Sequence, residues 1–162
     1  MNQETSLISF LDDIITYGDL AARIDEVSEL NRLLYLNDGK SFTARIADKI
    51  SPGLFKIISS LEQAKQLPTT TSELEDFFLS LRSYLGKVPH VTLTLAFDPP
   101  ESLVRLIADW FGKNLAAKTV LEIRVREEII AGMIIEYNGK YKDYSKMGQL
   151  GEALRQVLST NI

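Results

Sequence analysis

With 162 residues, 45% of them apolar and 25% charged, the chain is long enough for one medium-sized domain or two small ones with hydrophobic cores. A formal charge of −4 without a basic cluster argues against nucleic acid as a partner, and the absence of cysteine excludes disulfides and thiolate metal sites. We also expect no direct membrane insertion, because no apolar run approaches the about 20 residues of a spanning helix and the opening residues lack a basic signal region.

Apolar residues recur at helical spacing through the first half of the chain and predict five helices. Gly18 is expected to end the first helix, and Asp19 to cap the second. Ser51-Pro52 is typical of a cap followed by the first helical position. Ser72 and Glu75 have the spacing of a capping box before the last of these helices. The predicted helices cover residues 6–17, 20–34, 42–50, 52–67 and 72–85.

Period-2 alternation of apolar residues begins after Pro89 and predicts strands. Met133–Tyr137 is apolar on both faces except at Glu136, which favours a central strand. Asn138-Gly139 supplies the positive φ angles of a type I′ turn and therefore predicts an antiparallel hairpin. The predicted strands cover residues 91–97, 121–125, 131–137 and 140–144.

Two further helices are expected in this half. Asp98 is expected to cap the first of them, with Pro99-Pro100 in its opening turn and Glu101 reaching back to the cap. The apolar positions that should form its buried face are Leu103, Ile107, Trp110 and Phe111. The second helix ends the chain, with Met147, Leu150, Leu154 and Val157 at helical spacing.

The change of pattern near Pro89 predicts an α+β protein with two domains. Residues 1–87 are expected to form an α-helical bundle. Residues 88–162 are expected to form a small β-α-β-β-β-α domain with a mixed sheet.

Candidate catalytic residues are few, and none has a partner that would activate it. His90 is the only histidine and is expected to be a linker or edge residue, since one imidazole makes neither a triad nor a metal site. The acidic pairs Asp12-Asp13 and Glu127-Glu128 are interpreted as solvated residues. The glycines lack the spacing of a phosphate-binding loop. We therefore predict no catalytic residue, no cofactor and no metal.

Gly132 lies inside a strand pattern, where a glycine marks a bulge or a place where another backbone comes very close. A side chain at this position should collide with its neighbour. Asp143 and Ser145 follow the hairpin, and Ser145 is expected to cap the final helix. The residues with predicted structural roles are Gly132, Asn138, Gly139, Asp143 and Ser145.

The stretch from Val120 to Ser145 resembles the C-terminal domain of the delta subunit of rotary ATP synthases, the oligomycin sensitivity conferral protein family. The acidic turn before Ala131-Gly132 matches the family, as do Asp143, Ser145, Gly148 and Leu150. Tyr144 and Met147 depart from it, because they stand where the family has glycine and arginine. The resemblance covers residues 88–159 and is weaker over residues 52–84.

The resemblance implies a non-catalytic stator subunit, which would lie in the cytoplasm against the inner face of the cell membrane as a single copy within the synthase complex. The helical domain would then bind N-terminal segments of the alpha subunits, and the second domain the b subunit of the peripheral stalk.

Five apolar residues are candidates for the groove that binds the alpha subunit, and we expect Ile8, Leu11 and Ile15, with Phe55 or Ile58, to line it. The alternative is that all five belong to the bundle core. Two other functions stay open, a free-standing adapter that keeps this fold and an RNA-binding module with Tyr137 and Tyr141 on its sheet.

Overall fold

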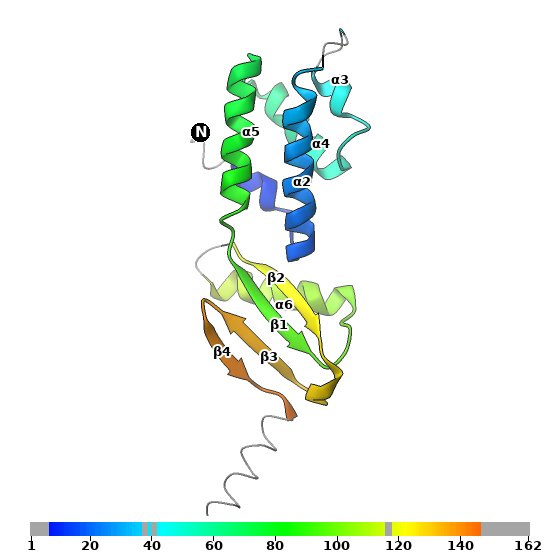
Figure 1. The fold of residues 1–162 in the computed structure, drawn as a ribbon, viewed down its shortest axis with the longest axis vertical. Coiled ribbons are helices and arrows are strands. Elements are labelled where there is room, and N and C mark those ends of the chain that lie inside the picture. Colours follow the sequence, from blue (N-terminus) through cyan, green and yellow to red (C-terminus); the bar gives the residue numbers. More distant parts are fainter. Residues whose placement is uncertain (1–6, 37–38, 40–41, 116–117, 147–162) are drawn as a thin grey trace, which may run out of the picture. The chain divides into compact units, whose positions relative to one another are not determined.

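A computed structural model describes residues 7–36, 39, 42–115 and 118–146 (Figure 1). Contacts divide the chain into two compact units. The first consists of Met1–Ile14 and Gly18–Val88, and the second of Ile15–Tyr17 and Pro89–Ile162. The chain therefore enters the second unit briefly, returns to the first, and passes to the second again near Pro89.

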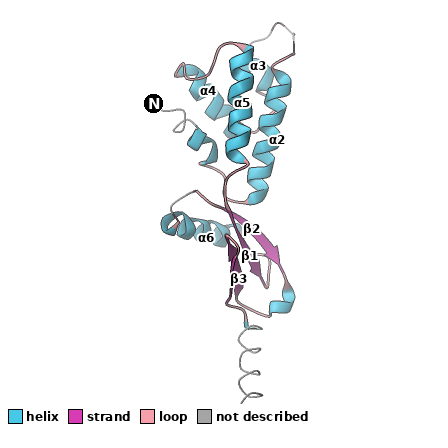
Figure 2. Cartoon of the chain, turned by 60° about the vertical axis from the view of Figure 1, so that its left-hand side comes forward, coloured by secondary structure: helices cyan, strands magenta, loops and turns pink. Residues whose placement is uncertain are grey.

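The described part of the first unit is helical (Figure 2). Its core contains side chains from every described helix of the unit, among them Phe10, Leu30, Ile46, Ile58 and Phe78, all at most 1% exposed. The ring centroid of Phe77 lies 6.2 Å from that of Phe10 in a tilted arrangement and 5.5 Å from that of Phe78 in an edge-on arrangement. The elements are η1 (Ser9–Leu11), α2 (Tyr17–Leu33), α3 (Phe42–Ile46), α4 (Pro52–Gln63) and α5 (Thr71–Leu85).

Side-chain caps fix where α4 and α5 begin. Ser51 caps α4 by accepting a hydrogen bond from the backbone N–H of Leu54, and Pro52 is the first helical residue, which confirms the prediction. The capping box of α5 is wrong by two residues. Thr70, not Ser72, accepts from the backbone N–H of Glu73, because Thr70 and Glu73 have the same spacing two residues earlier.

The predicted helix over 6–17 is too long, because the described chain is helical over residues 7–11 and then turns at Asp12 and Asp13. After η1 the chain becomes extended, and Gly18 and Asp19 lie in the first turn of α2 instead of ending one helix and capping the next. The cause is pairing within the second unit. The backbone N–H of Leu121 donates to the carbonyl of Ile15 at 2.9 Å, and Thr16 forms a parallel bridge with Leu121.

The described part of the second unit is a four-stranded sheet with order β2-β1-β3-β4. Strand β1 pairs in parallel with β2 and antiparallel with β3, which in turn pairs antiparallel with β4. This arrangement confirms the predicted α+β class with a mixed sheet and the central position of β3. The elements are β1 (His90–Leu95), α6 (Glu101–Asn114), β2 (Val120–Val125), η2 (Glu127–Ile129), β3 (Met133–Tyr137) and β4 (Lys140–Asp143). The predicted final helix lies outside the described residues.

One face of this sheet packs on α6 and forms the core of the unit, built around Val91, Leu93, Phe111 and Leu121. Two expectations about α6 are wrong. Its N-cap is Pro100, not Asp98, and no side chain caps it by a hydrogen bond. Trp110 is 57% exposed instead of buried, because the residues that face the sheet are one position further round the helix.

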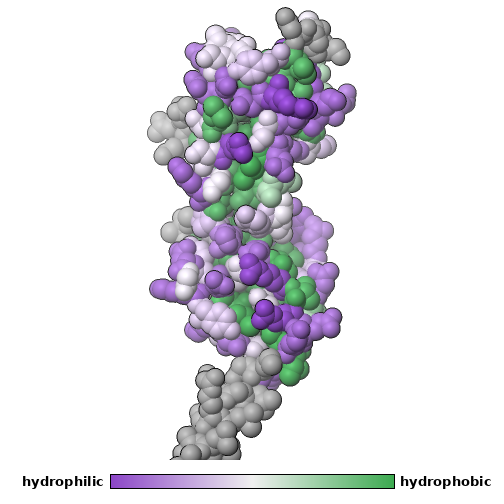
Figure 3. Space-filling model, viewed as in Figure 1, coloured by the Kyte–Doolittle hydropathy of each residue, from purple (hydrophilic) through white to green (hydrophobic). Residues whose placement is uncertain are grey.

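The opposite face of the sheet is largely polar. Glu122, Thr92, Glu136 and Tyr141 stand side by side across all four strands. Thr92 donates a hydrogen bond to Glu122 at 2.8 Å, and hydrogen bonds from Arg124 and then from Thr92 lower the pKa of Glu122. Figure 3 shows hydrophilic side chains over the strands of this unit with apolar patches beside them.

Candidate partner-binding groove

A groove of about 580 Å³ runs between η1 and α4 in the first unit. Its wall on the η1 side carries Ser9, Asp12 and Asp13. The α4 side presents residues at helical spacing (i, i+3, i+4, i+7, i+8 and i+11) that form a single face of the helix. These residues are Gly53, Lys56, Ile57, Ser60, Leu61 and Ala64.

Several side chains on this face of α4 are small and project little from the helix. Gly53, Ser60 and Ala64 follow one another along the helix at intervals of seven and four residues. Between them Ile57 is half-buried and Leu61 is buried, so apolar surface lies at the bottom of the groove. A low face with apolar residues at its base can accept the side chains of a helix laid along it.

A buried arginine holds the η1 wall in place. Arg23 on α2 is 5% exposed and donates to the Asp13 carboxylate at 2.9 Å and to the carbonyl of Phe10 at 3.3 Å. Its Nε lies 3.3 Å from the Glu26 carboxylate, which also accepts from the hydroxyl of Ser51 at 3.1 Å. The network thus ties η1 and the start of α4 to α2.

The same network explains the glycine at the start of α4. A Cβ at Gly53 would lie 2.7 Å from Oδ2 of Asp13, the oxygen that binds Arg23. The network was not predicted from the sequence, where Asp12-Asp13 is interpreted as a solvated pair. An arginine on the buried side of α2 gives no periodic signal, because its long side chain reads as polar in any hydropathy pattern.

The structure moves the predicted partner-binding residues away from this groove. Leu11 and Ile58 are 2% and 0% exposed and belong to the core, which corrects the expectation that they line an open groove. Phe55 is half-buried on the face of α4 opposite the groove. Ile15 lies in the second unit, and Ile8 is 53% exposed just before η1. Among the described residues, none of the five lines the groove.

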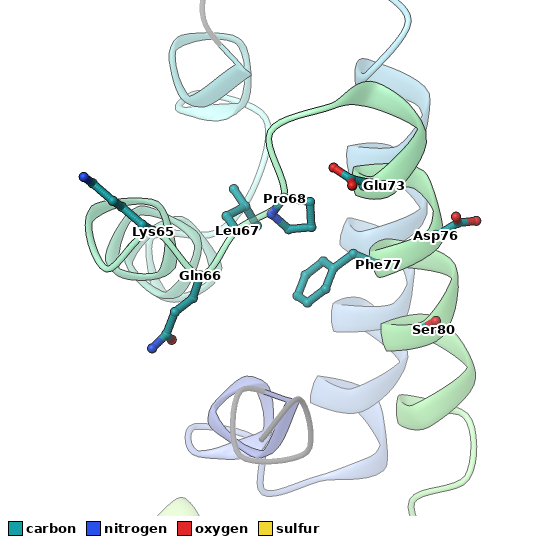
Figure 4. Close-up of a pocket in the computed structure, with 8 residues that line it drawn as sticks. All are labelled: Lys65, Gln66, Leu67, Pro68, Glu73, Asp76, Phe77 and Ser80. Atoms are coloured by element: carbon teal, nitrogen blue, oxygen red, sulfur yellow. The ribbon is translucent and has the colours of Figure 1, made fainter. Parts of the chain in front are cut away.

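A second hollow of about 470 Å³ lies between α5 and the loop that follows α4 (Figure 4). Phe77 projects into it from α5, and Leu67 and Pro68 face it from the loop. Glu73 and Asp76 make its α5 side acidic. Gln66 lines both hollows, so the loop after α4 separates two adjoining concave surfaces.

In the second unit, the backbone at Gly132 passes very close to the backbone of Tyr144 and Ser145, which follow the hairpin. We call this close approach the crossing. Asn138 and Gly139 have φ angles of 50° and 72°, as the predicted turn requires. Gly132 has a φ angle of 89°, and a Cβ there would lie 2.3 Å from the carbonyl oxygen of Tyr144. The expected collision is confirmed.

Asp143 and Ser145 close this crossing. The Asp143 carboxylate accepts from the backbone N–H of Ser145 at 2.7 Å. Hydrogen bonds from the side chain and the backbone of Ser145 lower the pKa of Asp143. Ser145 is 1% exposed. The helix that it is expected to cap lies outside the described residues.

The loop before Gly132 is strained. Ile130 has φ 66° and ψ −57°, and the backbone N–H of Ala131 donates to the carbonyl of Ile129 at 2.7 Å. These values define a γ-turn of the rare form with positive φ, which is unfavourable for a β-branched residue. The Ile130 side chain is 67% exposed, so burial does not offset this strain.

His90 contacts the ring of Tyr17 at 5.3 Å between centroids, and its Nε2 lies 3.7 Å from the Glu122 carboxylate.

Within the described ranges, no three histidine, aspartate or glutamate side chains are placed to hold a metal ion. No helix in the described part of the chain is long and apolar enough to cross a membrane.

The family model described as the ATP synthase delta (OSCP) subunit matches residues 6–157. The ATP synthase subunit delta of Pseudothermotoga lettingae is 37% identical over 76 residues, which cover 47% of this chain and 41% of that protein. The mitochondrial ATP synthase peripheral stalk subunit OSCP of Bos taurus is 28% identical over 117 residues, which cover 68% of this chain and 54% of that protein.

The chain spans about half the length of these curated relatives. A chain of the Toxoplasma gondii mitochondrial ATP synthase hexamer aligns over 96% of this chain and 95% of its own length at 13% identity. The TM-score of this alignment is 0.38. The match to the family model extends over most of the sequence, and the chain therefore belongs to the ATP synthase delta (OSCP) subunit family.

Proposed function

We propose that this chain is a non-catalytic stator subunit of a rotary ATP synthase. Residues 1–87 would bind N-terminal segments of the alpha subunits, and residues 88–162 would bind the b subunit of the peripheral stalk. Such a link keeps the catalytic head from turning with the rotor, so that proton flow is coupled to ATP synthesis. The chain would reach the cytoplasmic face of the membrane only through the complex.

The groove between η1 and α4 is the observation that carries this proposal. Helix-in-groove recognition needs a trough with apolar anchors and room for a partner backbone. Ile57 and Leu61 supply the anchors, and Gly53, Ser60 and Ala64 leave the room. The residues that position the groove are bound to Arg23, which favours a wall formed before the partner arrives.

Charge adds a requirement on the partner. Asp12 and Asp13 stand at the η1 wall, and the side chain of Asp13 remains 52% exposed although it binds Arg23. Lys56 faces them from α4. A partner helix is therefore expected to carry a basic residue on the side that meets η1.

The test is a titration of the full-length chain with a synthetic peptide of the N-terminal residues of the alpha subunit from the same organism. Ser60→Tyr should fill the groove and Ile57→Asp should place a charge at its base, because an unpaired charge in a desolvated site is costly. Each substitution should weaken binding at least tenfold. Ser83→Tyr, on an exposed position of α5, is the matched control and should bind like the unsubstituted chain.

Two results would count against the proposal. Unchanged affinity in both groove variants, with their circular dichroism intact, would place the alpha-subunit site elsewhere. If the folded chain binds neither the alpha-subunit peptide nor the stalk subunit, a free-standing adapter becomes the better description.

A further inference from the structure

Helix α6 carries an apolar stripe outside the core of its unit. Leu103, Leu106 and Trp110 are spaced i, i+3 and i+7, which places them on one flank of the helix. Leu106 is 66% exposed and Trp110 57%. The residues of α6 that pack on the sheet are instead Val104, Ile107, Ala108 and Phe111. The stripe is therefore additional to the face that the sheet requires.

Beside this flank lies an incompletely covered part of the sheet. Ile135 and Tyr137 of β3 pack against the core under α6 but are only partly buried. Register places Lys142 opposite Ile135 and Lys140 opposite Tyr137, so both lysines point to the same side of the sheet. Every residue of β4 is exposed. Ile135 and Tyr137, which we call the apolar floor, are thus bordered by the two lysines of β4.

The connection between β1 and β2 determines which side of the sheet the apolar stripe of α6 faces. The β1–α6–β2 crossover is right-handed, as is usual for parallel strands, and it brings α6 over β1 and β2 (Figure 1). The flank of α6 that carries Leu106 and Trp110 then points to the β3–β4 side. We call the surface formed by Leu103, Leu106, Trp110, Ile135 and Tyr137 the α6–β3 surface.

We propose that the α6–β3 surface docks an amphipathic helix of the stalk subunit whose apolar face is bordered by acidic residues. The inference rests on the proposed stator function and assigns the stalk contact to one face of the second unit. A helix laid on a sheet beside another helix lies about 10 Å from each layer, which suits the open floor next to α6.

Charge decides the chemistry of this helix. Lys140 and Lys142 border the floor along β4, and Lys113 is exposed one turn beyond Trp110 at the outer border of the stripe. Cations on both sides of an apolar surface select carboxylates on both sides of the partner's apolar face. Trp110 is the natural anchor, because a large aromatic residue that becomes desolvated contributes much of the energy of an interface.

Trp110 also supplies the measurement, since it is the only tryptophan in the chain. The probe is the C-terminal segment of the stalk b subunit from the same organism, made without tryptophan and added to the full-length protein. We expect the emission of Trp110 to shift to shorter wavelength and its quenching by acrylamide to fall as the site saturates. Added salt should weaken binding, because exposed charges are screened.

Substitutions at exposed positions test the two components separately. Leu106→Glu should weaken binding at least tenfold by placing a carboxylate in the apolar stripe. Lys140→Glu with Lys142→Glu should weaken it similarly and remove most of its salt dependence. Leu79→Glu is the control, because Leu79 is a leucine of comparable exposure on α5 and should not affect the affinity for the stalk segment.

The outcomes separate this inference from the proposed function. Binding that neither shifts Trp110 emission nor responds to Leu106→Glu would show that the stalk docks elsewhere, which overturns the inference and leaves the stator function standing. No binding by the folded chain would instead contradict the stalk half of the proposed function. Protection of Trp110 in the free protein would also overturn the inference. If it grows with protein concentration, the occupant is a second copy; if it is constant, the occupant is the chain itself.

Discussion

Replacing Gly132 with alanine should destabilise the second unit more than any other single methyl group added at a described glycine. The new Cβ would lie 2.3 Å from the carbonyl oxygen of Tyr144 and 3.0 Å from the Cα of Ser145. Both atoms belong to backbone, so rotation of a side chain cannot relieve the contact. The φ angle of 89° adds strain for any residue with a Cβ.

The magnitude follows from these two terms. Alanine at a positive φ costs about 1 kcal/mol, and overpacking costs about 1–3 kcal/mol. Relief by movement would break the hydrogen bonds from Tyr144 to Met133 and from Lys146 to Ala131, each contributing about 1 kcal/mol. We therefore expect a loss of about 2–4 kcal/mol, which is a large part of the stability of a small domain.

The assay is urea unfolding followed by circular dichroism, with Gly139→Ala as the matched control. Gly139 has a φ angle of 72° but no heavy atom within 4 Å of an added Cβ, so this variant has the strain without the collision. It should lose about 1 kcal/mol. Equal losses in the two variants would refute the close crossing at Gly132, and no loss in either would refute both the crossing and the assigned turn.

Replacing Arg23 with methionine should destabilise the first unit by about 3 kcal/mol in the same assay, since it removes the cation of a buried network. Asp13→Asn should cost only about 0.5 kcal/mol, because the side chain of Asp13 is half exposed. Ile130→Gly should stabilise the second unit by about 1 kcal/mol by relieving the γ-turn, and a lower unfolding midpoint would contradict that turn. The lowered pKa of Asp143 contributes stability that is fully present above its ordinary value of 3.8 and is lost as pH falls through the folded value, so Asp143→Asn should flatten the acid limb of stability measured against pH. The purified chain should not hydrolyse ATP or bind it, and saturable micromolar binding competed by ADP would contradict a stator role.

Local signals predicted the elements whose causes are local. The cap of α4 at Ser51, the turn at Asn138-Gly139 and the close approach at Gly132 follow from the conformations that these residues favour or alone permit. The stripes of α2 and α5 also give their helices to within a few residues. The α+β class with a mixed sheet follows from these elements and the order in which they occur.

Features decided by distant partners could not be predicted. Ile15 and Thr16 continue a helical pattern, but pairing with Leu121 makes them extended. Trp110 fits a buried stripe in sequence, and only the position of the sheet shows that it lies beyond the covered arc. The groove was missed for the same reason, because its defining residues are small and its wall depends on Arg23, which a hydropathy pattern counts as exposed.

The short bridge at Thr16 has a consequence for solubility. A strand at the border of a sheet offers unpaired backbone groups to any other strand and invites aggregation. In this protein Thr16 occupies part of that border on β2, and the exposed lysines of β4 discourage stacking at the other border. A fragment that begins at residue 88 would lack Thr16 and its pairing with β2. Its β2 would therefore be an unprotected edge strand, and the fragment should aggregate more readily than the intact chain.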